Sequence, residues 1–307
     1  MKKGRNLRSV NTDGGVNLQF KLLSAIGIII IVSGHCYHGG MELAYNWFPP
    51  YSYNLALFVF ISGYFYKTDY EANVGKYIWK RTKRLLIPAY LWNIFYGGMV
   101  AFLGLFGFTI GAKPDLYNLF VMPFVDGEAF QYNLGSWFVY PLFLVCIINV
   151  LFRKFLKLIH LDNELIVLIV YLAIGMIGIN TALENPTAIN GIVKLLVRTM
   201  FFLPCYEFGR FYKAVLEKKD TLNNVAYFAI IFAVQLILLT FCKDLEYTPS
   251  SFTKFNNGFV IPYISSITAI AFWLRVSRLL VPAIGNSKLV RLIADNTYGI
   301  MVNQLVG

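Results

Sequence analysis

Apolar residues in this chain come in blocks long enough to cross a lipid bilayer, and this feature restricts the fold more than any other. A helix rises about 1.5 Å per residue and the hydrocarbon core is about 30 Å thick. We identify about nine such blocks, at residues 22–37, 53–66, 86–106, 137–152, 165–181, 193–212, 225–242, 258–274 and 292 onward. Several are short and contain Gly, Ser, Pro or Asn, which is typical of helices packed around an internal cavity.

The composition agrees with a membrane protein. Of the 307 residues, 57% are hydrophobic and only 14% are charged, which is too apolar for an ordinary soluble domain. No long soluble block interrupts the spans, so we expect an all-α, polytopic transmembrane helical bundle of about nine to ten spans, forming a single domain over residues 1–307. The last apolar block ends at Gly307, about sixteen residues after its start, so a truncated last helix is one interpretation.

Basic residues predict the orientation of the bundle. Segments 1–21, 67–85, 153–164, 210–224 and 275–291 contain all but five of the 27 Lys and Arg residues; the five are Lys113, Lys194, Arg198, Lys243 and Lys254. Because Lys and Arg accumulate on the cytoplasmic side of a membrane, the N-terminus is predicted to be cytoplasmic. Topology and attraction to anionic membrane lipids account for the net charge of +11, so no nucleic-acid partner is expected.

Neither a secretory leader nor a disulfide or metal framework is predicted. The basic N-terminus precedes an apolar run without a small-residue cleavage pattern, so we interpret this run as a first transmembrane helix. The four cysteines lack paired spacing. His35 and His38 lie one turn apart, but no third His, Asp or Glu accompanies them at ligand spacing, so no metal is expected.

His35 is the first candidate for chemistry. It ends the run SAIGIIIIVSGH in the first span, and ionisable groups at membrane depth are costly and usually face a cavity or a partner. It lies fourteen residues after Lys21, about 21 Å along a helix axis, in the outer half of the bilayer. The alternative is an interfacial histidine beside a loop.

Two further segments supply candidate site residues. In KYIWKRTKRLLIP, Lys80, Arg81 and Arg84 share a helical face at the cytoplasmic start of the third span. Guanidinium groups there suit a phosphate-bearing ligand, and an anchor at the lipid headgroups is the alternative. In LALFVFISGYFY of the second span, Ser62 and Gly63 would let the first helix approach closely, leaving Ser62 free to hydrogen-bond in the cavity.

Six motifs follow one another along the chain: SGH ending at His35, FVFISGYF, KRTKRLLIP, SWFVYPLF beginning at Ser136, FFLPCYEFGRFY and NTYGIMVNQ. The motifs and their order resemble acyltransferase family 3, the bacterial integral-membrane enzymes that use acyl-CoA to modify sugars of cell-surface polysaccharides. These motifs extend over nearly the whole chain. The chain departs from the family pattern at Lys21 and Ser24, where an Asp and an Arg are common, and at Asn303, where a histidine is frequent.

The resemblance implies a membrane acyltransferase of the bacterial plasma membrane. His35 would be the base, or a transient acyl carrier, for transfer of an acetyl or other acyl group to a hydroxyl of a cell-surface or lipid-linked glycan. Lys80, Arg81 and Arg84 would hold the phosphates of acyl-CoA, a co-substrate and not a permanently bound cofactor. We assign Ser33, Ser62 and Tyr64 to the surroundings of the cavity.

The sequence is also compatible with two other functions. A transporter or flippase for a glycan or an anionic substrate would use His35 for proton coupling, although no carboxylate partner for it is evident in the neighbouring spans. A relative that has lost its activity is suggested by Ser24 and Asn303.

Overall fold

The computed structural model describes residues 12–13, 16–36, 46–108, 111, 113–242 and 244–304, and most of them are helical. A two-residue antiparallel ladder, β1 (Thr12–Asp13) with β2 (Val16–Asn17), precedes the helices. The longer helices are α1 (Leu18–Cys36), α3 (Asn54–Tyr64), α4 (Val74–Arg81), α5 (Ile87–Leu105), α7 (Val139–Leu158), α8 (Glu164–Glu184), α9 (Gly191–Phe211), α11 (Asn224–Phe241), α12 (Ile261–Ile284) and α13 (Lys288–Asp295).

Shorter helical segments connect these helices. They are η1 (Pro50–Ser52), η2 (Thr68–Glu71), η3 (Thr82–Leu86), η4 (Tyr117–Val121), α6 (Met122–Val125), η5 (Gln131–Phe138), η6 (Pro186–Ala188), η7 (Tyr212–Leu216), α10 (Glu217–Lys219) and α14 (Thr297–Asn303). Segment η3 is a π-helical turn that joins α4 to α5 in one continuous helical stretch.

The predicted all-α transmembrane bundle is confirmed, whereas the predicted count of nine to ten spans is not. Within the described residues, six helical stretches are long and apolar enough to cross a membrane, beginning at Leu18, Val74, Gln131, Glu164, Asn224 and Ile261. Helix α3 is apolar but has only 11 residues. Helix α9 has 21 residues but carries Lys194, Arg198, Glu207 and Arg210.

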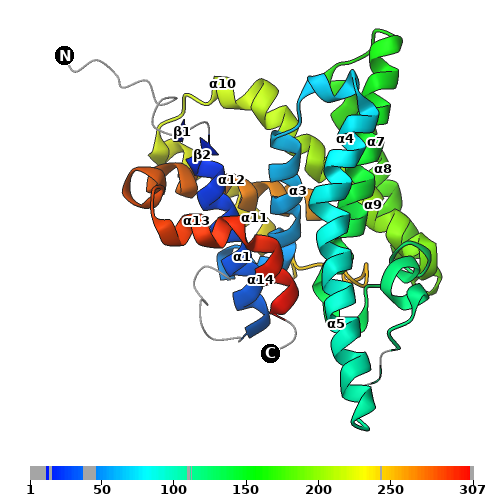
Figure 1. Ribbon diagram of the computed structural model, residues 1–307. Helices are drawn as coiled ribbons and strands as arrows, with labels where there is room; N and C mark the ends of the chain where they lie inside the picture. Colours follow the sequence, from blue (N-terminus) through cyan, green and yellow to red (C-terminus); the bar gives the residue numbers. More distant parts are fainter. Residues whose placement is uncertain are drawn as a thin grey trace.

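The helices form two groups with α3 between them. In Figure 1, α1, α13 and α14 lie on one side of α3, and α5, α7, α8 and α9 lie on the other. We call the end of the bundle that carries segments 67–85, 153–164 and 210–224 the basic end; it is at the top of Figure 1. Helices α4, α8 and α11 begin there, and each has an Asn N-cap whose side chain accepts a backbone N–H: Asn73, Asn163 and Asn223.

Glycines bring α3 and α9 into direct backbone contact. A Cβ at Gly63 would overlap the carbonyl of Tyr206, and a Cβ at Gly209 would overlap the carbonyl of Phe60. Small residues permit such close crossings in membrane proteins, where dispersion and not the hydrophobic effect holds helices together. The expectation that Gly63 accommodates the first helix is therefore wrong, because its close neighbour is α9.

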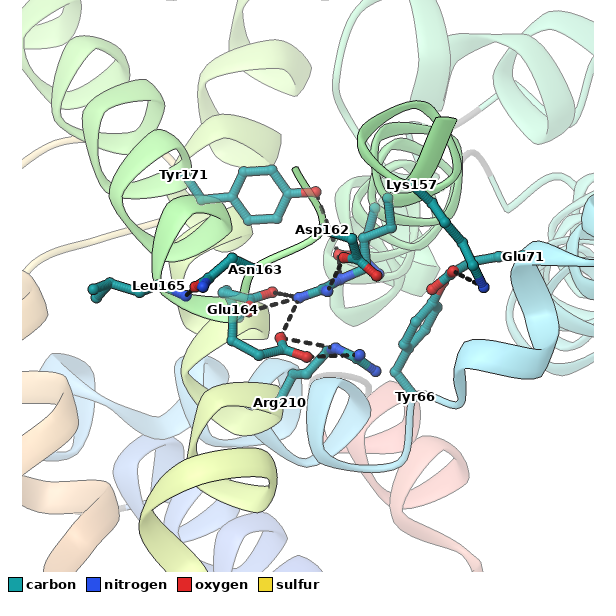
Figure 2. Close-up of polar contacts among 12 residues, drawn as sticks. Tyr66, Glu71, Lys157, Asp162, Asn163, Glu164, Leu165, Tyr171 and Arg210 are labelled. Carbon is teal, nitrogen blue, oxygen red and sulfur yellow. Dashed lines mark hydrogen bonds and ion pairs between the residues drawn. The ribbon is translucent and has the colours of Figure 1, made fainter. Parts of the chain in front are cut away.

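A buried cluster of charges joins α7, α8 and α9 at the basic end. Arg153 is fully buried, and its Nη2 lies 2.7 Å from both carboxylate oxygens of Glu207 and 2.7 Å from Glu164. Its Nη1 donates to Asp162 at 3.2 Å, and Arg210 binds Glu164 at 2.7 Å. Figure 2 shows Asp162, Glu164 and Arg210 converging on this cluster. Each charge is therefore partnered by an opposite one.

We predict that Arg153→Leu strongly destabilises the fold, because it leaves the fully buried Glu207 without its partner. Removing one member of a buried ion pair costs about 3–5 kcal/mol. The matched control is Lys154→Leu, which removes a neighbouring cation that is exposed. Thermal unfolding of the purified protein in detergent should show a large drop in melting temperature for Arg153→Leu alone. Equal melting temperatures for both variants would contradict the importance of the cluster.

Candidate functional site

His35 lies at the end of α1 away from the basic end and lines a cavity of about 310 Å³. The wall is assembled from segments that are far apart in the sequence. It is formed by Ile31, His35, Tyr51, Asn54, Leu55, Glu128, Ala129, Leu134, Gly135, Trp137, Phe138, Arg198, Thr248, Pro249, Ser250, Met301 and Gln304. The volume falls in the range of small-molecule sites, and the wall combines aromatic surface with a few polar groups, as such sites do.

Tyr51 contacts both the ring of His35 and the backbone next to it. The Tyr51 hydroxyl donates to the carbonyl of Gly34 at 3.0 Å and lies 3.4 Å from Nδ1 of His35. The hydroxyl has one proton, so when it donates to Gly34 the contact with His35 is formed by the tautomer that carries its proton on Nδ1. A neutral imidazole then keeps its lone pair on Nε2. The side chain of His35 is exposed, so this nitrogen can act as a base.

Arg198 holds together the far wall of the cavity. It is 1% exposed and donates to three backbone carbonyls: that of Pro249 at 3.2 Å, and those of Gly127 and Ser250. Its guanidinium also stacks on Trp137, with Cζ 4.6 Å from the ring centroid. One buried cation therefore joins α9, η5 and two connecting loops.

The loop after α11 is anchored at a second point. Tyr247 is buried, and its hydroxyl lies 2.6 Å from the hydroxyl of Ser266 on α12. Burial raises the pKa of Tyr247 well above its ordinary value, so this phenol stays neutral and able to donate. The cavity wall at 248–250 is thus fixed by two independent contacts.

A second cavity, of about 330 Å³, lies on α1 near its start. Asn17, Phe20, Lys21 and Ser24 line it together with Val16, Phe65 and Ala294. One helical face of α1 carries Ser24 of the second cavity, Ile31 of the first cavity and Ile28 between them. Ser24 and Ile31 are seven residues apart, which is about 10 Å along the helix. The two cavities therefore lie along the same face of α1, separated by Ile28, which is 1% exposed.

Lys21 and Ser24, which line this second cavity, both have partners in the structure. Lys21 pairs with Asp295 of α13, and Ser24 donates to the carbonyl of Phe20 at 2.8 Å. Two of the three positions at which the chain departs from the motif pattern, Lys21 and Ser24, are thus part of a cavity on the same helical face as His35.

Lys80, Arg81 and Arg84 do not converge on one point. Lys80 is exposed and donates to the hydroxyl of Tyr70 at 3.2 Å. Arg81 is half-buried and donates to the hydroxyl of Tyr77 at 3.0 Å. Arg84 is exposed and forms no hydrogen bond or ion pair with any other described residue. None of the three lines either cavity on α1.

Ser33, Ser62 and Tyr64 also lie outside the wall of the His35 cavity. Ser33 donates to the carbonyl of Ile30 at 3.2 Å, and Ser62 is half-buried on α3. Tyr64 is at the basic end, where its hydroxyl donates to Glu217 at 3.0 Å. Asn303 is exposed and accepts from Tyr96 at 2.7 Å. His38 lies outside the described residues.

Sequence reasoning missed several members of the cavity wall, among them Tyr51, Glu128, Arg198 and Gln304. A signal for Arg198 was present, since it is one of the five basic residues outside the basic segments. Lys194, another of these five, forms an ion pair with Glu128 of the wall.

The sequence model of a protein family, described as an acyltransferase domain, matches residues 17–302. The chain belongs to acyltransferase family 3. The match includes α1, nearly all of α14 and the lining of both cavities on α1 except Val16 and Gln304. No curated protein and no solved structure matches the chain. Membership of this family and the apolar helices together support a membrane acyltransferase in general.

We predict that Arg198→Met loosens the cavity wall. Methionine fills similar space but leaves the carbonyls of Gly127 and Pro249, which are buried, and that of Ser250, which is partly buried, without a donor. Each buried carbonyl left without a donor costs about 1–3 kcal/mol. Limited proteolysis should then cleave the 244–257 loop faster than in the unaltered protein. Leu196→Met, two residues away on the exposed face of α9, is the matched control and should leave the rate unchanged. Equal cleavage rates in the two variants would show that Arg198 does not hold the loop.

Proposed function

We propose that this acyltransferase moves an acyl group, in the simplest case acetyl, from acyl-CoA to a hydroxyl of a cell-surface or lipid-linked glycan. The observation that carries the proposal is the position of His35. Its imidazole is exposed in a cavity of about 310 Å³ whose walls provide aromatic surface and hydrogen-bonding groups. Sugars present hydroxyls and apolar faces, which such a wall can bind.

The chemistry requires one base near neutral pKa, which His35 can provide. As the sugar hydroxyl attacks the thioester carbonyl, Nε2 of His35 takes its proton, and a tetrahedral intermediate forms. Collapse of this intermediate breaks the C–S bond, and the imidazolium returns the proton to the departing thiolate of CoA. Alternatively, His35 accepts the acyl group first and then passes it to the hydroxyl. The hydrogen bond between Nδ1 and Tyr51 would orient the ring in both routes.

We further propose that the donor and the acceptor reach His35 from opposite sides of a bacterial plasma membrane. The distribution of basic residues supports a cytoplasmic location for both the N-terminus and the basic end of the bundle. Acyl-CoA would then bind from the cytoplasm and the glycan from outside. The second cavity on α1 suits the arrival of the donor, because it lies on the same helical face as His35.

A movement of the Ile28 side chain would connect the second cavity with the cavity of His35. From Ser24 to His35 is eleven residues, about 16 Å along the helix, which an extended pantetheine arm can span. Ile28 lies between the two cavities and is buried, so its side chain would have to move when the donor binds. The phosphates would then lie near Lys21, whereas Lys80, Arg81 and Arg84 offer a second place for them on α4 and η3.

The glycan would lie against the outer wall of the cavity. Trp137 and Tyr51 supply aromatic surface, and Glu128, Asn54 and Gln304 supply polar groups at the height of His35. The Oε1 atom of Gln304 is buried without a hydrogen-bond partner among the described residues, so it is available to accept from a sugar hydroxyl.

The test is acyl transfer by the purified protein in liposomes, with labelled acetyl-CoA and a panel of bacterial lipid-linked glycans. His35→Ala should reduce the rate by about 10²–10⁴-fold, the usual contribution of a general base. His160→Ala, which changes an exposed histidine at the end of α7, should leave the rate unchanged. Full transfer by His35→Ala would exclude the mechanism, and glycan movement without acylation would identify a transporter instead.

The same assay separates the two proposed phosphate sites. If the donor binds along α1, Lys21→Ala should raise the KM for acetyl-CoA, while Arg84→Ala should not. The opposite result would place the phosphates at Arg84.

A further inference from the structure

A third cavity, of about 430 Å³, lies near the basic end between α3, α9, α11 and α12. It shares no residue with the two cavities on α1. Its lining is apolar or aromatic except for Lys219 and Asp220 at one end. A long apolar pocket with a charged mouth fits a ligand with a hydrocarbon part and a charged head.

One face of α12 forms a long side of this cavity. Ile267, Ile270 and Leu274 follow the spacing of a single helical face over about 10 Å. The edges of the cavity are open and apolar, since Ile267 is 38% exposed and Leu222 is 48% exposed. In a multi-pass membrane protein, an opening with such edges faces the hydrocarbon of the bilayer.

The mouth carries more positive than negative charge. Asp220 binds Arg275 at 2.6 Å and Arg278 at 2.8 Å, one with each carboxylate oxygen. Lys219 also lines the cavity and forms no ion pair with any other described residue. A second carboxylate, Glu217, lies close by, where it accepts from Tyr64 beside Tyr212. The three cations Arg275, Arg278 and Lys219 still outnumber the two carboxylates, and an anion bound there would balance the excess.

Two of the cations at the mouth, Arg275 and Arg278, are held in place by tyrosines. Cζ of Arg275 lies 3.9 Å from the ring centroid of Tyr227, and Arg278 also donates to the hydroxyl of Tyr212 at 3.4 Å. Both tyrosines line the apolar part of the cavity. The charged mouth and the apolar wall are thus one connected structure, prepared before a ligand binds.

From this geometry we propose that the cavity binds one anionic phospholipid. An acyl chain lies along the Ile267–Leu274 face of α12, and the phosphate lies at the mouth, beside Lys219 and Arg278. The inference does not depend on the proposed acyl transfer, because the cavity shares no residue with the site around His35. The lipid would bridge α9, α11 and α12, which all contribute residues to the cavity.

The experiment measures thermal unfolding of the delipidated protein in detergent while phosphatidylglycerol is added. A ligand that binds only the folded state raises the melting temperature, by about 5 °C at a large excess over Kd. Phosphatidylcholine with the same chains should raise it much less, and glycerophosphoglycerol, which has no acyl chains, should not raise it. Equal shifts with the two lipids, or a full shift with glycerophosphoglycerol, would overturn the proposal.

Two pairs of variants locate the site. Ile267→Trp places a bulky ring in the cavity and should abolish the shift, whereas Ile264→Trp, at an equally exposed position outside the cavity, should keep it. Lys219→Glu should weaken the shift, and Lys218→Glu, outside the lining, should not. Lys219 is on the surface, so this pair reports on binding even if the tryptophan variant folds poorly. Unchanged shifts in both test variants would refute the site.

Discussion

Charged groups inside a membrane bundle need partners, and α9 shows how this requirement organises the protein. The helix carries Arg198 near one end and Glu207 near the other, and both are buried. Glu207 is paired with Arg153 of α7, and Arg198 donates to carbonyls of two loops. Because an unpartnered charge is so costly in a low-dielectric interior, these contacts fix the neighbours of α9 at both ends.

The close crossing of α3 and α9 adds a second constraint to this arrangement. With glycine at 63 and 209, the two backbones touch, so α3 cannot move without α9. Helix α3 also contributes Asn54 and Leu55 to the cavity of His35. The rigid part of the bundle therefore supports one wall of the candidate site, while α1 supplies the histidine from the other side. A catalytic group held between rigid walls is positioned at little entropic cost at the moment of reaction.

Much of the architecture could be predicted from the sequence, because span length, apolar content and the distribution of Lys and Arg are local properties. His35 stood out for the same reason, as an ionisable residue in an aliphatic run. The partner of Gly63 could not be predicted, since any neighbouring helix would benefit from a glycine. The composition of the cavity wall could not be predicted either, because Tyr51, Arg198 and Gln304 come together only when distant segments fold against one another. Three of the predicted blocks are not long apolar helices, which explains why the two counts differ. Helix α3 is short, α9 is charged, and the block from residue 292 onward is divided between the short helices α13 and α14.

The central claim is that the two cavities along α1 open to opposite sides of the membrane. The most direct measurement is labelling of single cysteines with a membrane-impermeant thiol reagent, in a protein whose four native cysteines are replaced. Ser24→Cys should react only when the reagent reaches the cytoplasmic face, and acyl-CoA should protect it. Ser250→Cys, in the wall of the His35 cavity, should react in intact cells. Labelling of both cysteines from the same side would contradict the account.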